Sequence, residues 1–253
     1  MDTRVAGLSW QNVPVMIRPT TRRRAVLFDL DGTLVDPRTA ISGGIGAALA
    51  AHGLPVPADE QLDAMIGPPL AASLQSVPGM TDELLPLVVE HYRVGYRAHG
   101  MSSSVVYPGI ADLLRELGEA GVLCAVATSK PEPLARELLD IQGLTSRFDA
   151  ICGSNPDESA PHEGKAAIVA AALESLSEAD AGSRGLDAVM VGDRFYDVDG
   201  ARANGIPCIG VSWGYAGTGE LEEAGAAAVV DDAAGLARAL AALSSDDEMK
   251  EAH

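Results

Sequence analysis

Two aspartates stand at the end of a short apolar run near the start of the chain. The run Ala25–Phe28 is followed by Asp29 and Asp31, with Gly32 and Thr33 next. Side chains two residues apart in extended backbone point to the same side. Carboxylates this close repel each other unless a cation lies between them or one is protonated. The pair therefore predicts metal or acid–base chemistry, and Gly32 lets the backbone bend and offer amides to a phosphate.

A second acidic segment follows a later apolar run. There Val191-Gly192 ends the run, Asp193 comes directly after it, and Asp197 follows four residues later. Mg²⁺ prefers hard oxygen ligands and keeps several waters, so a few carboxylates at neighbouring strand ends and a substrate phosphate can hold it. We expect a magnesium site formed by Asp29, Asp31 and Asp193, with Asp197 in a supporting position.

Polar residues suited to phosphate follow two other segments. Thr128 ends the apolar run Val122–Ala127 and offers a hydroxyl, and Ser129 offers the following amide. Lys165 begins a later helical pattern and carries a point charge that can neutralise phosphoryl oxygens and pair with Asp197. With Gly32 and Thr33, these residues form the predicted phosphate-binding set.

Short apolar runs alternate with helical patterns over most of the chain, which predicts an α/β fold, a doubly wound parallel sheet with right-handed crossovers. Runs of this kind are typical of strands buried on both faces. The predicted strands are Ala25–Phe28, Val122–Ala127, Ala188–Val191, Ile206–Val211 and Ala226–Val230. The predicted helices between them are Ile110–Ala120, Pro131–Gln142, Lys165–Leu176, Val198–Asn204 and Ala233–Leu243.

One long interval interrupts the alternation. Residues 36–107 contain amphipathic segments but no convincing buried strand, which predicts an inserted α-helical cap domain. Because the insertion leaves directly after the first strand, we expect it to lie over the carboxyl end of the sheet, where open α/β sheets bind ligands. The predicted boundaries are a flexible basic N-terminal arm at 1–23, a core at 24–35 and 108–243, the cap at 36–107, and an acidic C-terminal tail at 244–253.

The order and spacing of these residues resemble the four motifs of the haloacid dehalogenase-like hydrolases. The motifs are Asp29-Leu-Asp-Gly-Thr-Leu34, Thr128, Lys165, and Gly192-Asp-Arg-x-x-Asp197. The chain most resembles the branch of phosphoglycolate phosphatases, β-phosphoglucomutases and 5′-nucleotidase-like proteins, which carry a helical cap between the first two motifs. The resemblance implies a Rossmann-like core and Mg²⁺ as cofactor.

Residue roles are also implied by the resemblance. Asp29 would be the nucleophile and a metal ligand, while Asp31 would protonate the leaving group, activate water and bind Mg²⁺ through its backbone carbonyl. Asp193 would complete the metal site, and Thr128 with the Ser129 amide would hold the phosphate. Lys165 would neutralise charge, steadied by Asp197. Dehalogenases of the superfamily lack the second acid, so Asp31 favours phosphate esters as substrates.

The implied activity is hydrolysis of a small phosphorylated metabolite through an aspartyl-phosphate. Two alternatives stay open: transfer of the phosphoryl group to a sugar or a protein side chain, and a catalytically silent metabolite-binding module. At the fourth motif many relatives place Ser after Gly-Asp, where this chain has Arg194. A surface position for Arg194 is the favoured interpretation, and contact with a substrate anion is the other.

Charge and cysteine content narrow the partners and the compartment. The formal net charge of −18 disfavours binding to nucleic acids and to anionic membranes. No stretch approaches the ~20 apolar residues of a membrane span. Cys124, Cys152 and Cys208 lie in or beside apolar runs without paired spacing, which is typical of buried thiols in a reducing compartment. We expect a cytoplasmic monomer or weak homodimer with a small phosphorylated substrate.

Overall fold

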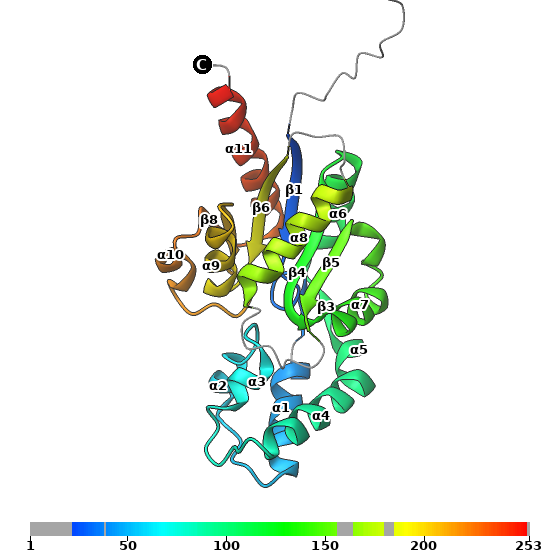
Figure 1. Ribbon diagram of the computed structural model, residues 1–253, viewed down its shortest axis with the longest axis vertical. Helices are drawn as coiled ribbons and strands as arrows, with labels where there is room; N and C mark the ends of the chain where they lie inside the picture. Colours follow the sequence, from blue (N-terminus) through cyan, green and yellow to red (C-terminus); the bar gives the residue numbers. More distant parts are fainter. Residues whose placement is uncertain (1–21, 38, 156–163, 180–184, 252–253) are drawn as a thin grey trace, which may run out of the picture.

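A parallel sheet forms the centre of the computed structural model, which describes residues 22–37, 39–155, 164–179 and 185–251 (Figure 1). Its six strands lie in the order β5-β4-β1-β6-β7-β8, and every neighbouring pair is parallel. The strands are β1 (Arg23–Phe28), β4 (Leu123–Pro131), β5 (Ala150–Ser154), β6 (Leu186–Gly192), β7 (Cys208–Val211) and β8 (Ala228–Val230). The predicted doubly wound α/β fold is confirmed.

Helices cover both faces of the sheet because successive strand residues face opposite sides. In β1, Val26 and Phe28 pack into one apolar cluster, whereas Ala25 and Leu27 pack into the other. The first cluster is completed by α6 (Ile110–Glu119), α7 (Glu132–Ile141) and α11 (Ala233–Glu251). The second is completed by α8 (Lys165–Ala179), α9 (Phe195–Ala203) and α10 (Glu220–Ala224). Apolar side chains of the helices therefore cover both faces of the sheet, as its uninterrupted apolar strands require.

Two elements differ from the sequence-based expectations. The edge strand β5 was not expected, because its five residues include Gly153 and Ser154 and only Ile151 is fully buried. Helix α11 continues to Glu251, beyond Leu243, where the tail was expected to begin. The predicted basic arm lies outside the described residues up to residue 21, and at Arg23 the chain already belongs to β1.

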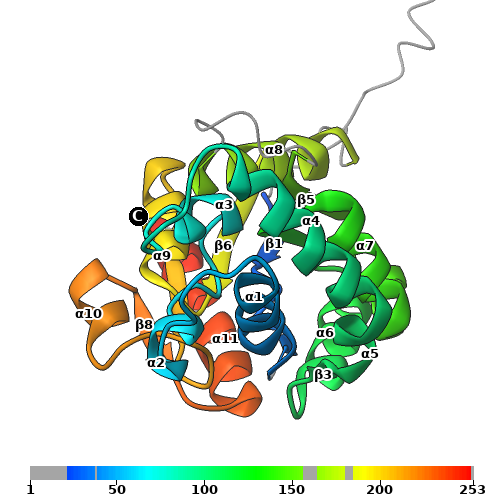
Figure 2. The same ribbon diagram turned by 90° about the horizontal axis from the view of Figure 1, so that it is seen from below.

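The predicted cap interval is helical. It contains α1 (Thr39–Ala51), α2 (Asp59–Asp63), α3 (Leu70–Leu74), α4 (Leu84–Gly95), a π-helical turn at Tyr96–Gly100 and α5 (Met101–Ser103). Apolar side chains such as Ile45, Leu49, Leu74 and Val88 are fully buried between these helices. Seen from below, α1 to α4 lie across one end of the sheet (Figure 2).

A small antiparallel ladder carries the chain into and out of these helices. It pairs β2 (Val35–Asp36) with β3 (Val105–Val106), and the Tyr107 amide donates a 3.1 Å hydrogen bond to the Leu34 carbonyl. The helical segment is thus anchored beside the carboxyl end of β1. That strand is also where the sheet order reverses, because the chain passes outward through β4 and β5 and then returns to β6. Such a switch point is the usual ligand-binding position in open α/β sheets.

Candidate active site

The segment after β1 forms a tight loop that presents its acids at the end of the sheet. The Asp29 amide still donates to Val191 of β6 (2.9 Å), which continues the ladder by one residue. The chain then turns, and the Gly32 amide donates to the carbonyl of Val35 (2.8 Å). Asp29 and Asp31 are 4% and 7% exposed. The loop therefore buries both predicted acids on the floor of the region under the cap.

Gly32 meets two requirements at this turn. Its φ is +86°, a left-handed conformation that side chains other than glycine adopt only with strain. A Cβ atom at Gly32 would also lie 2.3 Å from Oδ2 of Asp193. The backbone of the first motif and the carboxylate of the fourth motif therefore touch, although 160 residues of chain separate them.

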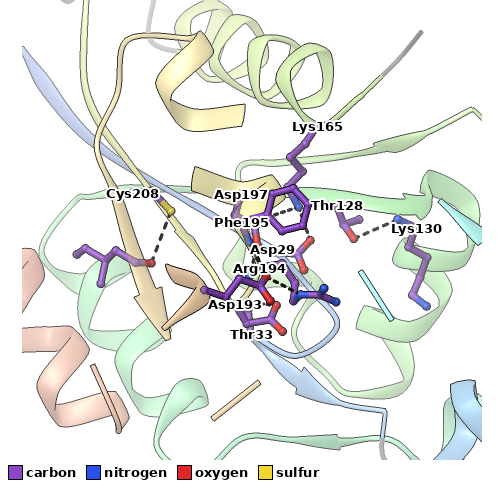
Figure 3. A network of polar contacts seen from close by, with 12 residues as sticks. Asp29, Thr33, Thr128, Lys130, Lys165, Asp193, Arg194, Phe195, Asp197 and Cys208 are labelled. Carbon is purple, nitrogen blue, oxygen red and sulfur yellow. Dashed lines mark hydrogen bonds and ion pairs between the residues drawn. The ribbon is translucent and has the colours of Figure 1, made fainter. Parts of the chain in front are cut away.

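Lys165 lies between two of the carboxylates. Its Nζ is 2.6 Å from Oδ1 of Asp29 and 2.7 Å from Oδ1 of Asp197 (Figure 3). Burial alone would lower the pKa of Lys165, but the charges of Asp197 and Asp29 more than offset this effect and raise it. The ammonium group is therefore held charged beside Asp29, as the sequence predicted.

Asp193 is held by a side chain and a backbone amide. Its Oδ1 accepts a hydrogen bond from the Thr33 hydroxyl at 3.2 Å, and its Oδ2 accepts one from the Tyr215 amide at 2.8 Å. Asp197 accepts a 3.0 Å hydrogen bond from the Arg194 amide at the start of α9, which satisfies one of the free donors of that helix end. Asp193 is thus held by the loops after β1 and β7, and Asp197 by the start of α9.

Three carboxylates gather closely enough to share one cation. One oxygen each of Asp29, Asp193 and Asp197 lies within 4.8 Å of the others, and all three residues are buried. Burial and then the charges of Asp197 and Asp29 raise the pKa of Asp193 well above its ordinary value. Burial, followed by the charge of Asp29, raises the pKa of Asp197 to about 6. Three acids balanced by one ammonium leave an excess of two negative charges if all are ionised, which suits a divalent cation with oxygen ligands.

The carboxylate of Asp31 has a different partner. Its Oδ2 lies 2.7 Å from Nζ of Lys130, and the side chains of both residues are 10% exposed or less. Burial raises the pKa of Asp31 although Lys130 opposes the shift. Sequence reasoning missed Lys130, and the signal available was an isolated lysine two residues after Thr128. The carboxylate of Asp31 does not belong to the group formed by Asp29, Asp193 and Asp197. The sequence placed Asp197 in a supporting position only, yet its carboxylate is the third member of that group.

A small cavity of about 60 Å³ lies between these acids and the cap. Its floor is formed by Asp29, Asp31 and the segment Thr128–Pro131 that ends β4. Its roof comes from the cap and includes Ile41, Met65, Ile66, Gly67, Pro68, Leu70, Tyr92, Arg93 and Tyr96. Thr128 is buried, and its hydroxyl accepts a hydrogen bond from the Lys130 amide at 3.2 Å. Of the predicted residues, Asp29, Asp31, Thr128 and Ser129 line this cavity. Lys165 contacts Asp29 from outside the lining, and Gly32 and Thr33 lie against Asp193 instead.

The expected surface position of Arg194 is wrong. The residue is 8% exposed, and its Nε donates to Oε1 of Glu220 at 2.9 Å. Its Nη1 donates to the carbonyl of Ile66 in the cap at 2.7 Å. Sequence spacing could not reveal this position, because both partners are distant in the chain and a Gly-Asp-Arg segment carries no signal for burial.

Comparison with known proteins agrees with this geometry. The model of the family "haloacid dehalogenase-like hydrolase" matches residues 26–211, which contain all four predicted motifs. The chain belongs to the haloacid dehalogenase-like hydrolases. The resemblance inferred from the motifs is confirmed, and with it the superfamily of the fold.

Individual relatives point to phosphoryl chemistry. A tyrosine-protein kinase PtkA from Mycobacterium tuberculosis is 39% identical over 197 residues, which cover 78% of this chain and 65% of the relative. A 5′-nucleotidase from Pseudomonas aeruginosa is 38% identical over 199 residues, covering 78% of this chain and 86% of the relative. A crystal structure described as a predicted phosphatase from Clostridium acetobutylicum superimposes with a TM-score of 0.77 at 35% identity, covering 87% of this chain and 99% of the other. The chain therefore spans just under two thirds of the kinase relative and most of the other two.

Proposed function

We propose that this chain is a Mg²⁺-dependent phosphomonoester hydrolase that acts on a small phosphorylated metabolite through an aspartyl-phosphate on Asp29. The observation that carries the proposal is the Asp29 carboxylate itself, which lies buried at the cavity floor with Lys165 at 2.6 Å and two further carboxylates beside it. A buried carboxylate that is held by an ammonium group at the floor of a cavity supports a nucleophilic role toward a phosphorus atom. The names of the 5′-nucleotidase and phosphatase relatives support the same chemistry.

Each residue has a defined part in this proposal. Asp29 attacks phosphorus and is esterified, which divides a difficult displacement into two easier ones. Lys165 stabilises the charge that spreads over the phosphoryl oxygens, while the Thr128 hydroxyl and the amides of Gly32, Thr33 and Ser129 orient those oxygens. Asp31 gives a proton to the leaving oxygen and later takes one from water. Asp29, Asp193 and the backbone carbonyl of Asp31 would hold Mg²⁺, which when bound supplies further charge stabilisation, with Asp197 in support.

Substitution of Asp29 tests the proposal. Asp29→Asn keeps the shape of the side chain but removes the nucleophile, so Mg²⁺-dependent release of phosphate from 4-nitrophenyl phosphate should fall to background. Asp112→Asn is the matched control, because the Asp112 side chain is 79% exposed on α6 and contacts Arg115 of the same helix. Retained turnover in the Asp29 variant would refute the assignment.

Phosphoryl transfer to another acceptor is the second candidate, and the kinase name of one relative at 39% identity favours testing it. Product analysis with labelled phosphate separates the two. Free labelled phosphate indicates hydrolysis, whereas label recovered in a sugar or on a tyrosine indicates transfer. The silent binding module is the third alternative, and any Asp29-dependent turnover excludes it.

The cellular setting belongs to the same proposal. Cys124, Cys152 and Cys208 are free thiols, and the first and last are buried, which supports a reducing compartment such as the cytoplasm. Within the described residues, no helix is both long and apolar enough to pass through a membrane. We expect a monomer or a weak homodimer that binds neither nucleic acid nor membranes.

A further inference from the structure

Lys130 is an unusual lysine for this chain. The sequence contains three lysines. The side chains of two of them, Lys130 and Lys165, are each only 6% exposed. Buried lysines are rare and require a charged partner. Lys165 belongs to the known motif set of the family, but Lys130 has no part in the function proposed above. Its contacts therefore call for a separate explanation.

The pairing between Lys130 and Asp31 makes the two oxygens of this carboxyl group different. Oδ2 lies 2.7 Å from the ammonium group, whereas Oδ1 is buried and has no hydrogen-bond partner among the described residues. An ammonium group has only donors and cannot accept a proton from a carboxylic acid. When Asp31 carries a proton, the proton must therefore be on Oδ1, the oxygen without a partner. Asp31 is one of the residues that line the cavity.

Lys130 is also held from the cap. Its Nζ donates to the hydroxyl of Tyr96 at 3.2 Å and lies 4.4 Å from the centre of the Tyr96 ring. Tyr96 is 1% exposed and stacks on Tyr92, with 5.6 Å between ring centres. The ammonium group thus lies between an acid of the core and an aromatic side chain of the cap. The position of the ammonium group is therefore set by contacts from both the core and the cap.

We propose that Lys130 is a positioning residue that selects Oδ1 of Asp31 as the proton-carrying oxygen and fixes it toward the cavity when Tyr96 closes over the site. The inference rests on the proposed hydrolase function. In the first step the bond between phosphorus and the leaving oxygen breaks, the Oδ1 proton passes to that oxygen, and phosphorus bonds to Asp29. In the second step a water oxygen bonds to phosphorus, one water proton returns to Oδ1, and the bond to Asp29 breaks.

The test compares esters that differ in their need for a proton. Benzyl phosphate and 4-nitrophenyl phosphate are similar in size, but the benzyl alkoxide is a far poorer leaving group than nitrophenolate. The ratio kcat/KM reports steps up to the first irreversible one, here the formation of the phosphoryl enzyme. Lys130→Met should lower kcat/KM roughly 100-fold for benzyl phosphate and less than about 10-fold for 4-nitrophenyl phosphate, as expected when general acid catalysis is impaired.

Three comparison variants sharpen the result. In an Asp31→Asn background, Lys130→Met should add little further loss for benzyl phosphate, because a residue that acts through another is not additive with it. Lys130→Arg keeps a donor-only cation and should recover much of the benzyl phosphate activity. Arg115→Met, at an exposed cation that pairs with Glu119, should change neither ester. If Lys130→Met is insoluble, Lys130→Gln provides the same comparison, since it removes the charge from a similar side chain.

The outcomes separate this inference from the function on which it rests. If Asp29→Asn retains turnover, the proposed function fails and the inference fails with it. If turnover depends on Asp29 but Lys130→Met lowers kcat/KM equally for both esters, or raises KM alone, the proposed function stands. Lys130 then binds substrate, and the positioning role is overturned. A selective loss for benzyl phosphate, absent in the Asp31→Asn background, supports the proposal.

Discussion

The guanidinium group of Arg194 joins the core to the cap through a 2.7 Å hydrogen bond to the carbonyl of Ile66. Its Nε is fixed at 2.9 Å by Glu220, which also accepts from the amides of Phe195 and Gly217. Ile66 immediately precedes Gly67 and Pro68, which line the roof of the cavity. A residue of the fourth motif therefore holds the loop at Ile66, which forms part of the roof above Asp29 and Asp31.

Removal of this guanidinium should loosen the cap. Arg194→Met leaves a buried carbonyl and a partly buried carboxylate without their partner, and hydrogen bonds to charged groups contribute about 1.5–3 kcal/mol. We expect a loss of this size in the free energy of urea unfolding and a higher KM. Arg202→Met is the control, because the Arg202 side chain is 65% exposed and should change stability by less than about 0.5 kcal/mol. Equal stabilities for the two variants would contradict the link between core and cap.

Substitutions of Gly32 and Gly53 distinguish the effect of backbone strain from the effect of displacing the Asp193 carboxylate. Gly32 and Gly53 both have positive φ, +86° and +70°, but only Gly32 has a carboxylate where a Cβ would lie. Gly53→Ala should cost about 1 kcal/mol of stability and leave turnover unchanged. Gly32→Ala should also displace Asp193 and lower kcat by about 100-fold, since a shift near 1 Å costs about that much. Wild-type kcat in Gly32→Ala, measured with 4-nitrophenyl phosphate, would exclude a close fit between the two motifs.

Because three carboxylates lie close together, Asp193→Asn should raise the stability of the protein without metal and reduce the stabilisation that Mg²⁺ provides. Asp193→Asn removes one of three like charges, and its amide can still meet both Thr33 and the Tyr215 amide. In EDTA the variant should therefore unfold at a higher temperature than the wild type. Mg²⁺ at 100 times its dissociation constant should stabilise the wild type by about 2.7 kcal/mol and the variant much less. Calorimetry in both conditions checks this, and a variant that gains as much from Mg²⁺ as the wild type would argue against Asp193 as a ligand.

Much of the fold could be predicted because its central strands are continuous apolar runs. Ala25–Phe28 and Val122–Ala127 are buried on both faces, so their composition alone distinguishes them from surface segments. The edge strand Ala150–Ser154 is short and buries little, so the same signal is absent there. Helix α9 begins at Phe195 rather than at the predicted Val198, because Asp197 caps the Arg194 amide inside its first turn.

Motif spacing in the sequence was enough to predict some residues of the candidate site. Residues whose positions depend on contacts with distant parts of the chain could not be predicted in this way. Asp29, Lys165 and Asp193 follow strand ends or open a helix, and the sheet brings them together. Lys130 and Asp31 are 99 positions apart, and nothing in the local sequence of either indicates the pairing seen at 2.7 Å. Arg194 was misplaced for the same reason, since its partner Ile66 belongs to a different part of the chain.

The central claim is that Asp29 becomes phosphorylated, and trapping that species tests it most directly. Asp31→Asn should slow the removal of the phosphoryl group, because no base then activates water, so the ester should accumulate when the variant is mixed with Mg²⁺ and 4-nitrophenyl phosphate. After acid quench and trypsin digestion, mass spectrometry should find one phosphoryl group on the peptide of residues 25–38, at Asp29. A peptide that stays unmodified while the variant releases nitrophenol in a burst, or a phosphoryl group on any other residue, would contradict the account.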